Sequence, residues 1–219
     1  MNKAKFFDAI RSKVNLTTAN VSGINQVLDY IQNHKILLGD AAYSLGTGFW
    51  ETAGTMQPVK EAYWKDENWR KRNLRYYPWY GRGLIQTTWK ENYIKIARAM
   101  GLSENTFINN PDLLLTMEYA LPAMFIGMSE GIYTGKDLDD YIDNIDESDA
   151  EDFREYKAAR KIVNGTDKDD EIARLALVFE AGLKAAGYDP ATGPVVKPTV
   201  PTVPVREQTW WEWFKGFFS

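Results

Sequence analysis

The sequence predicts a mainly α-helical domain with long loops and a small β-hairpin. Apolar side chains recur at helical spacing through much of the chain, whereas alternating strand patterns are few. Residues 63–88 are rich in Trp, Tyr, Arg, Gly and Pro without a clear period, which predicts the long loops and the hairpin. With 219 residues, 44% of them hydrophobic, the chain can bury one substantial core.

Five segments each predict a helix with one apolar face. They cover residues 21–31, 93–100, 121–128, 153–163 and 172–186. The first follows the N-cap candidates Thr17 and Thr18, while Gly101 and Gly187 end the second and the last. The fourth face is mixed, because Arg160 stands among its apolar residues. We interpret these faces as core packing.

A sixth predicted helix ends at Glu51 and has two unlike sides. These sides are Ala42, Leu45 and Phe49 at core spacing, and Ser44, Thr47, Gly48 and Glu51, which are mostly small. A side of small residues is expected to leave room for a ligand. The apolar neighbours Phe49 and Trp50 would favour the protonated form of Glu51, which can donate a proton. An ordinary surface glutamate is the alternative.

Composition excludes several kinds of site. The chain has no cysteine, and its single histidine, His34, lies at a predicted helix end and is interpreted as a surface residue. Cysteine nucleophiles are therefore excluded, and a Ser-His-Asp triad or a zinc site is disfavoured. The acidic residues 137–152 lack EF-hand spacing and predict a solvated loop and a helix start. We expect no metal or cofactor, which leaves carboxylate chemistry.

The charge balance bears on partners and on location. A net charge of -4 gives no reason to expect nucleic acid as a partner. The N-terminus has no apolar run long enough for a signal peptide, and no stretch approaches the ~20 apolar residues of a membrane span. We expect a chain made without an export signal and without a transmembrane helix.

Acid and base catalysis by carboxyl groups needs a partner for Glu51 on a different segment. Pro58 interrupts the chain soon after Gly54, so the chain can fold back and present Glu61 or Glu67. Glu61 is the nearer candidate. Glu67 lies among the basic side chains of residues 65–72, where a solvated salt bridge is the simpler explanation.

Residues 76–93, YYPWYGRGLIQTTWKENY, combine flat aromatic side chains with amides and hydroxyls. This combination suits the binding of sugars. The candidates for direct contact are Tyr80, Gln86, Thr88 and Asn92. Gly81 and Gly83 permit backbone conformations that are closed to other residues. A structural loop is the alternative, since neither a GxGxxG nor a Walker motif is present.

Three motifs in order resemble glycoside hydrolase family 19, the chitinase-like group that includes many bacteriophage endolysins. WETAGTMQPVKEAYW is similar to the family's His-Glu-Ser/Thr-Gly-Gly segment with its downstream Glu. The loop at 76–93 is similar to its Tyr-Gly-Arg-Gly-Pro-Ile-Gln segment, and ARKIVNGTD to its Ile-Asn-Gly-Gly segment. Together the motifs spread over roughly residues 20–187.

The resemblance implies a lysozyme-like helical fold and inverting hydrolysis of β-1,4 bonds between N-acetylated sugars. Glu51 matches the general acid, and Glu61 fits the spacing of the general base in compact phage-type members, with Glu67 second. The sugar-binding positions that match are Gln86, Thr88, Asn92 and Asn164. A cysteine-free chain without a signal peptide favours a monomeric endolysin over a secreted chitinase. Such an endolysin is made in the host cytoplasm and acts on peptidoglycan strands in the periplasm and cell wall.

Two departures from the family pattern lie next to Glu51. Trp50 stands where the family usually has His, and Ala53 stands at the first of two usual glycines. The hydrogen bonding around Glu51 therefore differs from the family's. Two alternatives to an endolysin stay open. One is a chitinase with the same mechanism, and the other is a cell-wall-binding protein with impaired catalysis.

The composition changes abruptly after Tyr188. Residues 189–205 contain five prolines, which predicts a catalytic domain at 1–188 and an extended linker at 189–207. The tail, residues 208–219, carries aromatic side chains at helical spacing that predict contact with a membrane or envelope. They are Trp210, Trp211, Trp213, Phe214 and Phe217. Docking onto a groove of the domain or onto a partner is the alternative.

Overall fold

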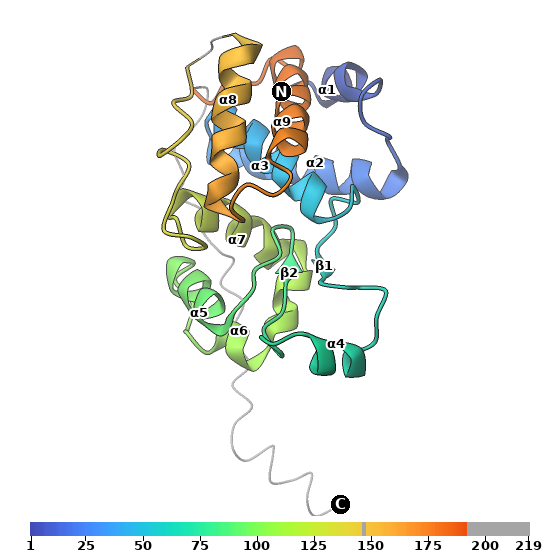
Figure 1. Cartoon of the computed structure of the whole chain (residues 1–219). Helices are drawn as coiled ribbons and strands as arrows, with labels where there is room; N and C mark the ends of the chain where they lie inside the picture. The colour runs from blue at the N-terminus through green and yellow to red at the C-terminus, as the bar shows by residue number, and fades with distance from the viewer. Residues whose placement is uncertain (146–147, 192–219) are drawn as a thin grey trace, which may run out of the picture.

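Helices dominate the computed structural model, which describes residues 1–145 and 148–191 (Figure 1). The helices are α1 Lys3–Ile10, α2 Thr18–His34, α3 Leu38–Glu51, α4 Glu67–Asn73, α5 Lys90–Ala99, α6 Thr106–Asn109, α7 Met117–Ser129, α8 Asp149–Ala159 and α9 Asp169–Ala185, with 3-10 turns η1 Pro111–Leu115 and η2 Arg160–Ile162. The strands are β1 Val59–Lys60 and β2 Arg82–Gly83. The predicted mainly α fold is confirmed.

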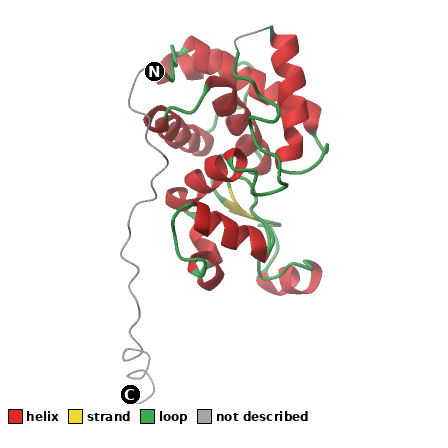
Figure 2. Cartoon of the chain, turned by 90° about the vertical axis from the view of Figure 1, so that its left-hand side faces the viewer, coloured by secondary structure: helices red, strands yellow, loops and turns green. Residues whose placement is uncertain are grey.

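Two lobes meet at α7. Figure 1 shows α1, α2, α3, α8 and α9 in the upper lobe and α4, α5, α6 and the strands in the lower lobe, and Figure 2 shows the same division from the side. Leu121 and Met124 of α7 belong to the core of the upper lobe, whereas Ala123 and Ile126 pack with α5 and α6 below. Helix α7 is apolar on all sides, as expected of a buried helix. Because its opposite sides pack into different cores, α7 joins the two lobes.

The small side of α3 is packed inside the fold. Ser44 and Thr47 are fully buried, and a Cβ added at Gly48 would lie 3.2 Å from Met124 Sδ of α7. Small residues allow neighbouring elements to pack closely, which a larger side chain would prevent. The prediction that this side leaves room for a ligand is therefore wrong, and only the end of α3 remains open.

The structure contains the predicted small antiparallel sheet and, before its second strand, a helix that was not predicted. β1 and β2 pair antiparallel with Val59 opposite Gly83, and a tight turn bonds the backbones of Arg82 and Thr87 to each other in both directions. Helix α4 was not predicted, because its segment has no apolar period. Its start is stabilised by Asp66, whose carboxylate accepts from the backbone N–H of Trp69 (2.7 Å).

The two ends of α2 agree with their sequence signals. Thr17 is the N-cap and forms a capping box with Asn20. His34 is the last residue of α2 and stacks on Tyr30, with ring centroids 3.9 Å apart. It is half-buried, and it does not line the cleft described below.

Most of the predictions for the C-terminal segment concern residues outside the described part of the chain. The described chain ends at residue 191, where Lys35 donates to the carbonyl oxygen of Ala191. The linker beyond that point and the aromatic residues of the tail lie outside the described part, so membrane contact stays a prediction. Within residues 1–145 and 148–191, no helix combines the length and apolar character needed to cross a bilayer.

Asp40→Asn is expected to stabilise the protein at neutral pH. Burial raises the pKa of Asp40 from 3.8 to about 6, against the opposing hydrogen bond from Asn144. Because the folded pKa is raised, stability is lost as pH rises from about 4 to about 6. The amide removes this loss and can still accept from Asn144, so we expect a gain of about 1–2 kcal/mol at pH 7 and little change at pH 4.

Thermal unfolding at the two pH values measures this difference. Glu91→Gln is the control, because Glu91 is an exposed carboxylate in the first turn of α5 and tests the loss of charge at a helix N-terminus alone. An equal shift of Asp40→Asn at both pH values would contradict the assignment to a buried carboxyl group.

Candidate active site

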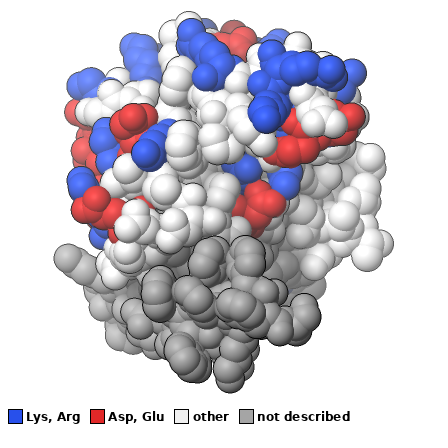
Figure 3. Space-filling view, turned by 90° about the horizontal axis from the view of Figure 1, so that it is seen from below, with Lys and Arg blue, Asp and Glu red and all other residues white. Residues whose placement is uncertain are grey.

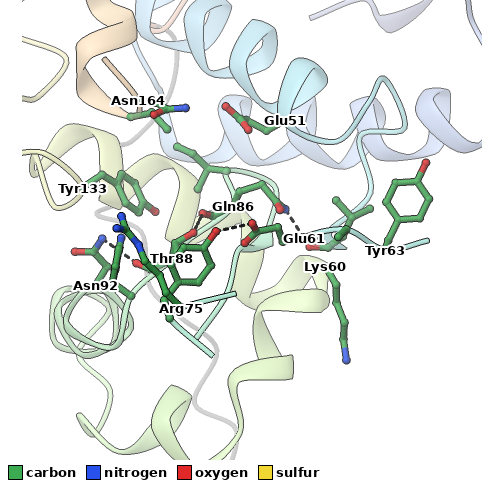
Figure 4. Close-up of a pocket in the computed structure, with 16 residues that line it drawn as sticks. Glu51, Lys60, Glu61, Tyr63, Arg75, Gln86, Thr88, Asn92, Tyr133 and Asn164 are labelled. Carbon is green, nitrogen blue, oxygen red and sulfur yellow. Dashed lines mark hydrogen bonds between the residues drawn. The ribbon is translucent and has the colours of Figure 1, made fainter. Parts of the chain in front are cut away.

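A cleft of about 500 Å³ lies between the two lobes. The upper wall holds Glu51 at the end of α3 and Asn164 after η2, as Figure 4 shows. The lower wall is built by residues 59–63 and by the loop at 75–92. Segments far apart in the sequence thus supply the two walls, and both predicted catalytic glutamates line the same cleft.

Glu51 is held by a buried arginine. Arg160 Nη1 donates to Glu51 Oε1 at 2.8 Å, and the two side chains are 2% and 17% exposed. Arg160 Nε donates to the carbonyl oxygen of Asp167, which fixes the guanidinium. Glu51 therefore has a charged partner rather than the predicted apolar neighbours. Arg160 was not predicted as a site residue, although a charge within an apolar helix face is a signal for a buried partner.

Trp50 and Phe49 lie away from the cleft. Both line a separate apolar hollow with Gly54 and Leu175, and Trp50 is 37% exposed there. Phe49 also packs edge-on against Phe179 in the core. The departure from the family pattern at Trp50 therefore changes the outer surface of α3 rather than the lining of the cleft.

Glu61 is fixed at both carboxylate oxygens. Tyr76 Oη donates to Oε1 at 2.6 Å, and the backbone N–H of Gly81 donates to Oε2 at 2.9 Å. Burial, followed by the hydrogen bond to Glu61, raises the pKa of Tyr76 to about 12, so its phenol stays protonated and keeps donating at neutral pH. A Cβ at Gly81 would lie 2.8 Å from Gln86 Oε1, so the glycine allows the side chain of Gln86 to approach the backbone closely.

Glu67 does not line the cleft. It stands in the first turn of α4, where Tyr80 Oη donates to both of its oxygens (3.2 and 3.1 Å) and Arg70 Nη1 donates to Oε2 at 3.2 Å. Between the two candidates for the second carboxylate, the geometry favours Glu61. Glu67 has the salt bridge that its basic neighbours indicate.

Tyr80 is a structural residue, which corrects its prediction as a substrate contact. Its side chain is 0% exposed, and the guanidinium of Arg82 lies over its ring at 3.7 Å. The remaining polar atom, Oη, is occupied by Glu67. An irregular loop has no period from which to tell inward from outward side chains, so the sequence offered no signal against Tyr80.

The other predicted sugar-binding residues line the cleft as a connected row. Gln86 Nε2 donates to the carbonyl oxygen of Val59 (3.0 Å), Thr88 Oγ1 donates to that of Gln86 (2.8 Å), and Asn92 Nδ2 donates to that of Thr88 (3.0 Å). Asn164 lies on the opposite wall near Glu51 (Figure 4). The structure thus brings four of the five predicted binding residues to one cleft.

Two residues of the cleft loop have a strained backbone conformation. Gln86 and Trp89 have φ values of 55° and 73°, in the left-handed region that side chains other than glycine rarely adopt. Such residues cost about 1–3 kcal/mol each and gather at functional sites. The strained backbone holds Gln86 and Trp89 so that both line the cleft.

Several further residues that were not among the predicted site residues also line the cleft. They are Lys60, Tyr63, Arg75, Tyr76, Trp89 and Tyr133. Aromatic rings and hydrogen-bonding groups together suit the alternating apolar faces and hydroxyls of a sugar chain. Within the described residues, no group of three or more His, Asp or Glu side chains is placed to hold a metal ion.

No protein-family model matches the chain, and no curated protein matches it. A function for the cleft therefore has to be inferred from its geometry and from the motifs of the sequence.

Proposed function

We propose that the chain is an inverting glycoside hydrolase, similar to family 19, with a lysozyme-like fold. One observation carries the proposal. Glu51 and Glu61 come from separate segments on opposite walls of a single cleft that is rich in aromatic and amide groups. Two carboxyl groups on either side of a glycosidic bond are what acid and base catalysis of its hydrolysis requires.

The contacts of the two carboxyl groups suggest their roles. Arg160 occupies Oε1 of Glu51, so Oε2 would carry the proton that passes to the departing sugar oxygen. Glu61, held by Tyr76 and Gly81, would take a proton from a water molecule as that water attacks the anomeric carbon. Attack by water from the face opposite the leaving group inverts the configuration.

We propose bacterial peptidoglycan as the substrate and host cell lysis as the role. In this role the protein is a monomeric muramidase of the endolysin type that is made in the host cytoplasm and acts in the periplasm and cell wall. The motifs that resemble family 19 and the absence of cysteine from the chain support this choice over a secreted chitinase.

The proposal is tested by the release of new reducing ends from purified peptidoglycan and from chitin oligomers. We expect release from peptidoglycan, products with muramic acid at the new reducing end by mass spectrometry, and the α anomer first by NMR. Faster cleavage of chitin would favour the chitinase. Binding to peptidoglycan without cleavage of either substrate would favour the wall-binding protein.

Trp50→His restores the residue that family 19 usually has and tests the impaired-protein alternative. Because Trp50 lines the outer hollow, kcat/KM on peptidoglycan is expected to stay within about threefold of wild type, as for other substitutions away from a site. Steady-state kinetics and a thermal midpoint check this. A gain of more than tenfold would instead indicate that Trp50 impairs catalysis.

A further inference from the structure

Arg75 is a cation on the cleft wall beside an exposed aromatic ring. Its guanidinium lies 5.1 Å from the ring centroid of Trp89, and both residues line the cleft. Trp89 is 41% exposed, and its ring also packs against Tyr76 at 5.0 Å. Stacking on a ring leaves the N–H groups at the edge of a guanidinium free to bind an anion.

The other charged groups of the cleft already have partners. Arg160 pairs with Glu51, and Lys60 pairs with Asp112 at 2.7 Å outside the cleft lining. Glu61 accepts from Tyr76 and Gly81. In the part of the chain that the structure describes, Arg75 forms no ion pair with a carboxylate. Among the described charges that line the cleft, Arg75 is thus available to an anionic ligand.

We propose that Arg75 binds a carboxylate on the substrate and thereby selects carboxylate-bearing glycans over chitin. This inference rests on the proposed function. Each N-acetylmuramic acid of peptidoglycan carries a lactyl group, which ends in a carboxylate or continues into a peptide with carboxylates of its own. Chitin has only N-acetyl and hydroxyl substituents. A planar guanidinium pairs with a carboxylate through two parallel hydrogen bonds, which neutral sugars cannot form.

The position of Arg75 indicates where the acidic sugar binds. In Figure 4, Arg75 lies beside Thr88 and Asn92, on the far side of Glu61 from Lys60 and Tyr63. These amide and hydroxyl groups would bind the sugar while Arg75 takes its acidic substituent. The muramic acid unit is therefore expected at this end of the cleft.

A general attraction between the protein and an acidic polymer is the competing explanation. Figure 3 shows Lys and Arg side chains next to Asp and Glu on the face seen from below, rather than one continuous basic patch. Interspersed charges give only a weak field at a distance. Arg72 is exposed on α4 and absent from the cleft lining, so Arg72→Gln removes the same charge three positions earlier in the chain without changing the lining.

The test compares Arg75→Gln, Arg72→Gln and wild type on soluble peptidoglycan strands and on chitin oligomers. Arg75→Gln is expected to lower kcat/KM on peptidoglycan by about 10- to 100-fold, mainly through KM, and to leave chitin oligomers unaffected. Arg75→Lys should recover part of the loss. An equal loss on both substrates, or an equal loss in Arg72→Gln, would overturn the inference.

Two further experiments identify which carboxylate Arg75 binds and test whether the selectivity appears without catalysis. An amidase that strips the peptides frees a lactyl carboxylate on each muramic acid, so retained discrimination shows that a lactyl carboxylate is sufficient for the contact, and lost discrimination assigns the contact to the carboxylates of the peptide. Binding of both substrates to Glu51→Gln, with and without Arg75→Gln, needs no turnover. Selective, Arg75-dependent binding by a chain that cleaves nothing would support the inference and refute the proposed function.

Discussion

Glu51→Gln is expected to lower the rate of peptidoglycan cleavage by a factor of about 10³, because an amide cannot donate the proton that the departing sugar needs. The variant should fold normally. Its amide oxygen can still accept from Arg160, whose side chain is 2% exposed and would otherwise be a buried, unpaired cation. Reducing-end release measures the rate, and the thermal midpoint verifies the fold.

Glu51→Ala is the informative contrast for this first prediction. It removes the acceptor of Arg160 as well as the acid, so we expect the same loss of activity together with a lower thermal midpoint. If Glu51→Gln retained more than about a tenth of the wild-type rate, general acid catalysis by this residue would be excluded.

Glu61→Gln is expected to reduce the rate by about 10²-fold or more, since the amide cannot take a proton from the attacking water. The amide can keep both contacts. Its oxygen can accept from the N–H of Gly81 and its nitrogen can donate to Tyr76, because a phenol oxygen also accepts. The loss of activity should therefore appear as a lower kcat, and the variant should remain folded.

Glu67→Gln is the matched control for the second carboxylate. Glu67 also accepts from a tyrosine hydroxyl, that of Tyr80, but it lies outside the cleft lining. We expect Glu67→Gln to keep nearly the wild-type rate. Loss of activity in Glu67→Gln with retention in Glu61→Gln would reverse the assignment of the base.

Local patterns predicted most of the helices and several residues of the cleft. The stripes around Leu28 and Leu121 lie on real helices because a helical period depends only on neighbours along the chain. Gln86, Thr88 and Asn92 were found because hydrogen-bonding side chains within an aromatic loop suit a ligand site, and Asn164 was found through the motif that resembles family 19.

Predictions of whether a side chain faces the core or the cleft were less successful. The small side of α3 was expected to face a ligand but is packed inside the fold, and Tyr80 was expected in the cleft but is buried beneath Arg82. Small residues and tyrosines both occur in protein cores and at binding sites. Their local sequence cannot distinguish the two, because the distinction depends on which distant element packs against them.

The sequence by itself determined the fold class, excluded cysteine nucleophiles, left a single histidine, and supplied the motifs that contain Glu51 and Glu61. Only the tertiary structure brought Glu61 and not Glu67 to the cleft, paired Glu51 with Arg160, and left Arg75 without an ion pair among the described residues. Glu51 and Arg160 are 109 positions apart in the chain. Contacts at such a separation arise from the packing of α3, α8 and α9, which no local period encodes.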